Sequence, residues 1–113
     1  DYSRPIRLEN VVKSYPKLNF QAAHLGGYER WEEATTCLYY DNVRFDTSSS
    51  LEFISKEFAR DIIHGFGVDK IFFGTDFPMW DHVNELGRFI NLNLSDDENR
   101  KILSQNFKKA YNI

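Results

Sequence analysis

The segment Ile71-Phe72-Phe73-Gly74-Thr75-Asp76 decides the predicted fold, because it is an apolar run that ends on a carboxylate. Such a run is typical of a strand buried on both faces of a parallel sheet. Two earlier segments have the same form: Leu18 to Ala23 leads into His24, and Val43 to Phe45 leads into Asp46. A helix-like stretch follows each run. The sequence therefore predicts repeated strand-then-helix units, a fold in which ligands bind at the carboxyl ends of the strands.

The apolar pattern also places the first helices. Pro5 suits the first turn of a helix that leads into the first strand. A later helix carries Phe58, Ile62 and Phe66 at intervals of four and stops at Gly67. The expected strands are Lys17–Ala23, Val43–Asp46 and Lys70–Phe73, and the expected early helices are Pro5–Ser14 and Trp31–Tyr39.

Two more helices are expected near the end of the chain. Val83, Leu86 and Ile90 have helical spacing, and Ser95 with Glu98 forms the pattern of a capping box for a last helix. That last helix has several apolar residues on one side, so we expect it to be packed. These residues are Ile102, Leu103, Phe107, Ala110 and Tyr111.

The lengths of the connections predict the topology of the sheet. Crossovers of about twenty residues or more favour parallel pairing with right-handed connections. The helices are expected on one side of the sheet if it curls as a barrel. A closed barrel of eight such units needs roughly 250 residues, and this chain has 113. The chain is therefore either a small open sheet or a piece of something larger.

Composition excludes several kinds of partner. The net charge of −3 and the pI of about 5.6 give neither a basic stripe for nucleic acid nor a polybasic segment for a membrane. The N-terminus lacks the apolar region of a signal peptide. A single cysteine, Cys37, excludes an internal disulfide and has no activating base near it in sequence. We therefore expect a cytoplasmic protein that binds neither nucleic acid nor membrane.

His24 and Asp76 are the residues most suited to chemistry. Each ends a strand of the same predicted sheet, and imidazole with carboxylate is a common ligand set for zinc. A catalytic zinc normally takes three protein ligands, and these residues supply only two. The other histidines do not end strands, because His64 lies inside a helix and His82 opens another. The alternative is that His24 is only hydrogen-bonded and that Asp76 caps the next segment.

Three motifs in order carry a resemblance to a known family: His24 to Gly27, Asn42 to Ser48, and Phe73 to Asp81. Together they resemble the C-terminal part of the amidohydrolase-related family, whose members are TIM-barrel, metal-dependent hydrolases and decarboxylases. The segment from Leu94 to Ala110 is similar to the last helix of that family. The resemblance covers nearly the whole chain.

The resemblance implies a role for each residue that it matches. His24 matches the histidine after the sixth barrel strand, which binds metal or polarises the substrate carbonyl. Asp76 matches the aspartate after the eighth strand, which binds metal and takes a proton from the attacking water. The family's histidines on the first and fifth strands have no counterpart here. The implied fold is thus a partial (β/α)8 TIM barrel, in which residues 1–113 are strands six to eight plus the C-terminal helices. Alone, this chain is expected to bind a divalent metal such as zinc poorly.

Other residues near the strand ends have weaker claims. Phe77 and Trp80 beside Asp76, and Tyr28 and Trp31 after His24, are candidates for contacts with a small-molecule substrate, although packing is the alternative for such aromatic residues. We expect Asp46 to make a structural hydrogen bond to the hydroxyl-rich run that follows it. That run, Thr47 to Ser50, is expected to cap a helix, with ligand binding as the alternative.

Two functional hypotheses follow. The first is a piece of a metal-dependent hydrolase acting on an amide, lactone or related bond, with decarboxylation of a small aromatic or unsaturated acid as a close variant. The second is a non-catalytic, oligomerising part-barrel, because a three-stranded sheet with two open edges invites pairing with another chain. Either a homo-oligomer or the remainder of the barrel is the expected partner. The enzyme hypothesis predicts that His24 and Asp76 converge.

Overall fold

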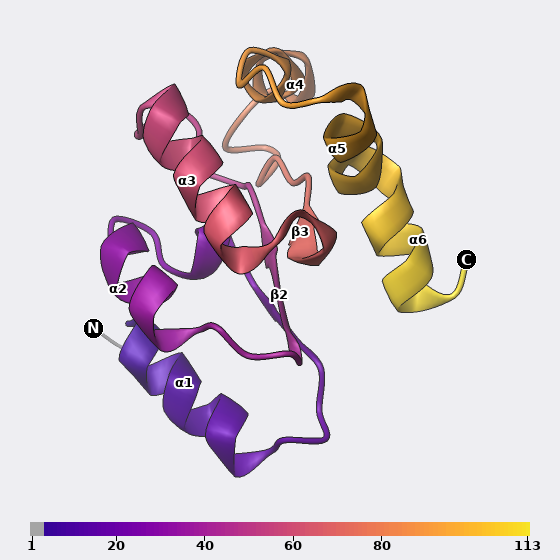
Figure 1. Ribbon diagram of the computed structural model, residues 1–113. Coiled ribbons are helices and arrows are strands. Elements are labelled where there is room, and N and C mark those ends of the chain that lie inside the picture. The colour runs from indigo at the N-terminus through magenta and orange to yellow at the C-terminus, as the bar shows by residue number, and fades with distance from the viewer. Residues whose placement is uncertain (1–3) are drawn as a thin grey trace.

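The computed structural model describes residues 4–113 and confirms the α/β class, with three strands between helices (Figure 1). Its elements run in the predicted order. They are α1 (Pro5–Ser14), β1 (Phe20–Ala22), η1 (His24–Gly26), α2 (Trp31–Cys37), β2 (Val43–Asp46), α3 (Lys56–Phe66), η2 (Val68–Lys70), β3 (Ile71–Phe72), α4 (His82–Ile90), α5 (Asp96–Arg100), η3 (Lys101–Gln105) and α6 (Asn106–Tyr111).

The three strands form one sheet in the order β1-β2-β3. Both pairs are parallel, as the connection lengths predict. β2 has the predicted bounds, whereas β1 and β3 are shorter than predicted. β1 starts late because Leu18 N–H is used in a turn with the carbonyl of Tyr15. β3 starts late because the short helical turn η2 takes up Lys70.

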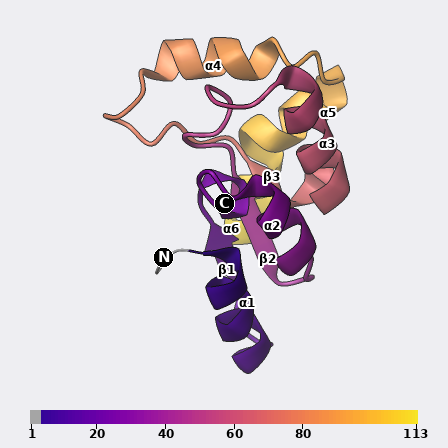
Figure 2. The ribbon, with the colours of Figure 1, turned by 90° about the vertical axis from the view of Figure 1, so that its left-hand side faces the viewer.

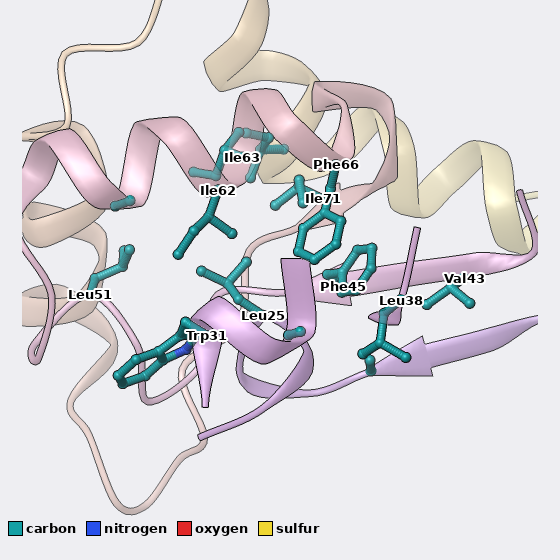
Figure 3. Close-up of a cluster of buried hydrophobic side chains, with 14 of the residues drawn as sticks. Leu25, Trp31, Leu38, Val43, Phe45, Leu51, Ile62, Ile63, Phe66 and Ile71 are labelled. Carbon is teal, nitrogen blue, oxygen red and sulfur yellow. The ribbon is translucent and has the colours of Figure 1, made fainter. Parts of the chain in front are cut away.

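One face of the sheet carries the main core. Val43 and Phe45 on β2 alternate with the half-buried Arg44 and Asp46, and Phe45 stacks on Phe66 of α3 with ring centroids 3.8 Å apart. Figure 3 shows these side chains packed between the strands and helix α3. Burial of this aliphatic and aromatic surface is the main stabilising term of the fold.

The opposite face of the sheet is covered in part by α6, which departs from the one-sided arrangement expected if the sheet curls as a barrel. Phe72 points away from the core that holds Ile71, and its ring contacts those of Phe107 and Tyr111. Tyr111 Oη also donates to the side chain of Gln21 at 3.2 Å. α1, α2 and α3 accordingly lie on one side of the strands and α6 on the other (Figure 1).

The last helix is continuous from α5 to α6, with a π-helical turn at η3, and it packs less completely than predicted. Ile102 is buried, but Leu103, Phe107 and Tyr111 are 38%, 43% and 53% exposed. The predicted capping box of Ser95 and Glu98 is confirmed. An amphipathic pattern thus identifies the helix face that packs but not how much of it a neighbour covers.

The last helix also closes the outer edge of β3. Phe73 N–H donates to the carbonyl of Ile102 at 2.9 Å, within the π-helical turn. The side chain of Asn106 donates to the carbonyls of Val68 and Ile71 at 2.7 and 2.8 Å. The expectation of two open sheet edges is therefore wrong for β3, because helical groups take the place of a neighbouring strand.

α4 lies at one end of the molecule and α1 at the other (Figures 1 and 2). The residues that predicted α4 are its exposed ones: Val83, Leu86 and Ile90 are 76%, 41% and 46% exposed. Phe89 and Glu85 are buried instead, and the Glu85 carboxylate pairs with Arg88 at 2.6 Å. Burial raises the pKa of the Glu85 carboxyl, and the ion pair with Arg88 opposes that shift.

Replacement of Asn106 with alanine is expected to lower the free energy of unfolding by about 2–4 kcal/mol, because two backbone carbonyls lose their donor. Urea denaturation measures the change. The control Gln105→Ala alters an exposed neighbour on the same helix and should change stability by no more than about 0.5 kcal/mol. Equal effects of the two substitutions would contradict this role of Asn106.

The raised pKa of Glu85 predicts a pH-dependent gain in the variant Glu85→Gln. The folded state favours the protonated carboxyl, so this contribution to stability is present below the ordinary pKa of 4.5 and is lost as the pH rises through the folded pKa. Unfolding measured from pH ~4 to ~7 should show Glu85→Gln gaining stability relative to the parent chain as the pH rises. The exposed control Glu57→Gln should show no such trend. A difference that stays constant or shrinks with pH would refute the argument.

Candidate functional site

Three loops meet at the carboxyl edge of the sheet, and each holds a non-glycine residue in the left-handed region. His24 follows β1 with φ 58°, Ser49 follows β2 with φ 47°, and Asp76 follows β3 with φ 57°. Positive φ is uncommon outside glycine, and such backbone strain concentrates at functional sites. His24 and Asp76 thus lie on the first and third of three adjacent strained loops.

The middle loop, Thr47 to Ser50, is the hub of this edge. All four hydroxyl side chains are 6% exposed or less. The prediction that this run caps a helix is wrong, because α3 is capped by Ser55, whose side chain accepts from Phe58 N–H. The buried hydroxyls instead bond to groups on the neighbouring loops, as buried polar groups must if they are not to cost free energy.

Ser48 holds His24. The His24 Nδ1 atom lies 3.0 Å from the carbonyl oxygen of Ser48 and 3.0 Å from its Oγ. The Ser48 hydroxyl makes a short hydrogen bond to Asp46 Oδ1, which also accepts from the backbone N–H groups of His24 and Ser48. The structural hydrogen bond predicted for Asp46 is therefore confirmed.

Ser49 holds Asp76. The Ser49 hydroxyl donates to Asp76 Oδ2 at 2.8 Å, and the indole Nε1–H of Trp80 donates to Ser49 Oγ at 2.8 Å. Asp76 is exposed, so its carboxylate is open to solvent while one oxygen is held. His24 and Asp76 thus bond to two consecutive residues of one loop.

Thr47 and Ser50, at the two ends of this loop, bond it to neighbouring segments. Thr47 Oγ1 accepts from Gly74 N–H at 3.2 Å and lies 3.4 Å from the Gly74 carbonyl, which ties the loop to the exit of β3. The Nε1–H of Trp31 is 3.0 Å from the His24 carbonyl and 3.3 Å from Ser50 Oγ. Trp31 is 9% exposed and lies in the core, so it supports the His24 loop from beneath.

Three aromatic side chains form a row along the same edge, from the His24 loop to the Asp76 loop. Tyr28 and Phe53 pack edge to face with centroids 5.4 Å apart, and Phe53 and Trp80 do so at 5.7 Å. Tyr28 and Phe53 are 45% and 46% exposed, so the row presents ring surface to solvent. Arg88 lies over Trp80, 5.7 Å from the ring centroid. Tyr28 and Trp80 belong to the predicted set, whereas Phe53 was not predicted.

Phe77 lies apart from this row. It is 65% exposed and stacks on His82 with centroids 4.7 Å apart, just beyond Asp76. His64, the remaining histidine, pairs with Glu98 at 2.7 Å on another part of the surface. Within residues 4–113, no group of three or more histidine, cysteine, aspartate or glutamate side chains is placed to hold a metal ion.

A groove of about 930 Å³ runs between α1 and β1, next to His24. It is lined by Arg7, Leu8 and Val11 of α1, by residues 21–24, which run from β1 into η1, and by Arg30. β1 is an edge strand of the sheet, so the groove follows that edge. Cys37 lies outside it, and burial raises the pKa of its thiol, which disfavours the thiolate that a nucleophile requires.

Sequence reasoning missed Ser48, Ser49 and Phe53. The hydroxyl run itself is visible in the sequence, but a run of this kind also caps helices, and its partners are distant in the chain. Phe53 follows the run by three residues in a segment without periodicity. Within the described part of the chain, none of the helices is long and apolar enough to cross a membrane.

Solved structures with a similar fold include a dihydroxybenzoic acid decarboxylase from Polaromonas sp. JS666 with bound manganese and the inhibitor 2-nitroresorcinol. It matches 96% of this chain with a TM-score of 0.74 and 21% identity. A 2,6-dihydroxybenzoate decarboxylase in complex with 2,6-dihydroxybenzoate matches 96% at TM-score 0.72 and 20% identity. An amidohydrolase from Burkholderia multivorans with bound zinc matches 96% of this chain, with a TM-score of 0.76 and 13% identity.

These likenesses establish the fold, since each identity is below 25%. The chain spans 38%, 40% and 49% of the three solved chains, less than half of each. A comparison with curated proteins finds no significant match. The model of the amidohydrolase family matches residues 1–113, the whole of the sequence. The chain therefore belongs to the amidohydrolase family, as its strand-end motifs predict.

Proposed function

We propose that this chain supplies part of a metal-dependent active site that acts on a small organic molecule, with His24 and Asp76 as metal ligands. The observation that carries the proposal is the hydrogen bonding of these two residues to the consecutive residues Ser48 and Ser49 at one sheet edge. Both candidate ligands are thus tied to the same loop at the carboxyl edge of the sheet, which supports the enzyme hypothesis.

The donor set fits a divalent metal in kind but not in number. Imidazole nitrogen and carboxylate oxygen are ordinary ligands of zinc and manganese. The residues described here offer two such side chains, and a catalytic zinc normally takes three. Further ligands would come from elsewhere in the complete active site, as expected for a chain that spans less than half of its structural relatives.

Hydrolysis of an amide, lactone or related bond is the reaction that we infer first. A divalent metal at this site would lower the pKa of a bound water molecule. Asp76 would then accept the proton of that water, because its carboxylate is exposed and one oxygen is held by Ser49. His24 would orient or polarise the carbonyl of the substrate.

Decarboxylation of an aromatic acid is the second candidate, and the row formed by Tyr28, Phe53 and Trp80 favours it. Exposed rings along the site edge suit a planar substrate, which stacks on them. Two of the solved structures are decarboxylases of dihydroxybenzoates. In this reaction the same ligands would hold the acid, and the row would fix the plane of its ring.

The groove beside β1 is the place where we propose that the sheet continues. It follows the strand edge, whereas the outer edge of β3 is already bonded by the last helix. Sheet edges pair readily with another strand. The remainder of a barrel or a second copy of the chain would each supply one.

Mn²⁺ titration followed by NMR tests the metal site, because bound Mn²⁺ broadens nearby signals even when binding is weak. Signals of His24, Ser49 and Asp76 should broaden first. In His24→Gln and in Asp76→Asn this selective broadening should require at least about tenfold more Mn²⁺, the change expected for loss of one ligand-strength contact.

The control variant Asp97→Asn alters an exposed carboxylate on α5 and should leave the broadening at the strand ends unchanged. Broadening that centres on the acidic start of α5 would contradict the proposed metal site. So would equal broadening in the parent chain, His24→Gln and Asp76→Asn.

2,6-Dihydroxybenzoate is a suitable probe of the aromatic row. Its binding should shift the ring signals of Tyr28, Phe53 and Trp80, and Phe53→Ala should weaken binding about threefold to tenfold, as expected for loss of an aromatic pair. The exposed control Tyr15→Ala should not change the affinity. Cyclohexanecarboxylate, which lacks a flat ring, should bind more weakly. Equal affinities for the two acids would favour the hydrolase alternative.

A further inference from the structure

We propose that Asp46 and Ser48 are positioning residues that hold His24 in the tautomer protonated at Nδ1, so that Nε2 keeps its lone pair for a metal or a proton. The proposal deepens the proposed function, which treats His24 as a ligand. Its evidence is the hydrogen-bonding chain from Asp46 through Ser48 to the imidazole.

The first argument for a proton on Nδ1 comes from the backbone carbonyl of Ser48. Its oxygen lies 3.0 Å from His24 Nδ1, and a carbonyl oxygen only accepts hydrogen bonds. If Nδ1 were unprotonated, two lone pairs would face each other at this distance. The proton of the neutral imidazole must therefore be on Nδ1.

The second argument for a proton on Nδ1 comes from the side-chain hydroxyl of Ser48, and it is independent of the first. Ser48 Oγ has one proton, which it gives to the Asp46 carboxylate in the short hydrogen bond. Its lone pairs then face Nδ1 at 3.0 Å, which again requires a proton on Nδ1. The opposite tautomer would need the hydroxyl proton to point at Nδ1, and the Asp46 contact would be lost.

The surroundings of Asp46 keep it an acceptor. Its Oδ1 also accepts hydrogen bonds from the backbone N–H groups of His24 and Ser48, at 3.2 and 3.1 Å. Its Oδ2 accepts one from the side-chain amide of Gln21 at 3.1 Å. Every one of these partners is a donor. The carboxylate thus fixes the direction of the Ser48 hydroxyl, and the hydroxyl fixes the imidazole.

Such an arrangement matters because a histidine binds metal or accepts a proton only through an unprotonated nitrogen. Partners that donate to or accept from the other nitrogen set which atom that is, and their loss typically weakens a site. Here Asp46 and Ser48 keep the proton on Nδ1, so the lone pair of Nε2 remains available for a metal or a proton. Both would act through His24 and not directly on a substrate.

Long-range ¹H–¹⁵N NMR of the imidazole nitrogens tests the proposal directly, without metal or substrate. The chain has three histidines, so spectra of His64→Gln and His82→Gln identify the signals of His24. At about pH 8.5, where free imidazole is neutral, the proton of His24 should be on Nδ1. A proton on Nε2 in the parent chain would overturn the proposal.

The variants then test the two positioning residues. Ser48→Ala and Asp46→Asn should each lower the ratio of the Nδ1–H to the Nε2–H tautomer roughly tenfold, the effect of losing one ordinary hydrogen bond. Ser48→Thr keeps the hydroxyl and should retain the parent ratio, and Ser104→Ala is a control at a half-buried serine of the last helix. Backbone NMR spectra verify that each variant is folded, and Asp46→Asn with Ser48→Thr decides the matter if Ser48→Ala does not fold.

An unchanged ratio in both Ser48→Ala and Asp46→Asn would show that the side chains do not set the tautomer and would overturn the proposal. The result is separable from the proposed function, because the tautomer is read in the metal-free chain. If Mn²⁺ fails to broaden His24 while the tautomer shifts as stated, the positioning stands and the metal role fails.

Discussion

The structure depends on one constraint: four hydroxyl side chains, from Thr47 to Ser50, are buried together and must find hydrogen-bond partners. Their partners come from both neighbouring strand ends. Leaving such groups unsatisfied would cost roughly 1–3 kcal/mol each, so this loop can be packed only when the exits of β1 and β3 are in place beside it. The middle loop is therefore a structural joint for the sheet and a support for His24 and Asp76.

The rest of the fold positions this joint. The core between the sheet and α3 fixes β2, from which the loop emerges, through the stacking of Phe45 on Phe66. The last helix fixes β3, because Asn106 and the carbonyl of Ile102 bond to its outer edge. β1 is held from one side by β2 and is flanked by the groove on the other. The sheet is thus anchored at β3 and open to extension at β1.

Local patterns predicted the elements well and the long-range contacts poorly. The alternation of Val43, Arg44, Phe45 and Asp46 is a purely local signal, and β2 has the predicted bounds. Asp46 also behaves as predicted, since its partner Ser48 is two residues away. The contacts of Ser48 with His24 and of Ser49 with Asp76 span 24 and 27 residues, and no local pattern encodes them. The same limit explains α6, whose apolar stripe was visible but whose position on the second face of the sheet was not.

The division between local and distant contacts bears on how the site is organised. A metal site works best when its ligands are held in place before the metal arrives, because the cost of ordering them is then part of folding. Here the supports of both candidate ligands belong to the same chain and the same loop, and that loop is buried by the core of this chain. Ligands supplied from elsewhere would meet two side chains whose loops are already fixed. The folding of this chain thus sets the positions of both candidate ligands, and in the proposed metal site the further ligands would come from outside the described residues.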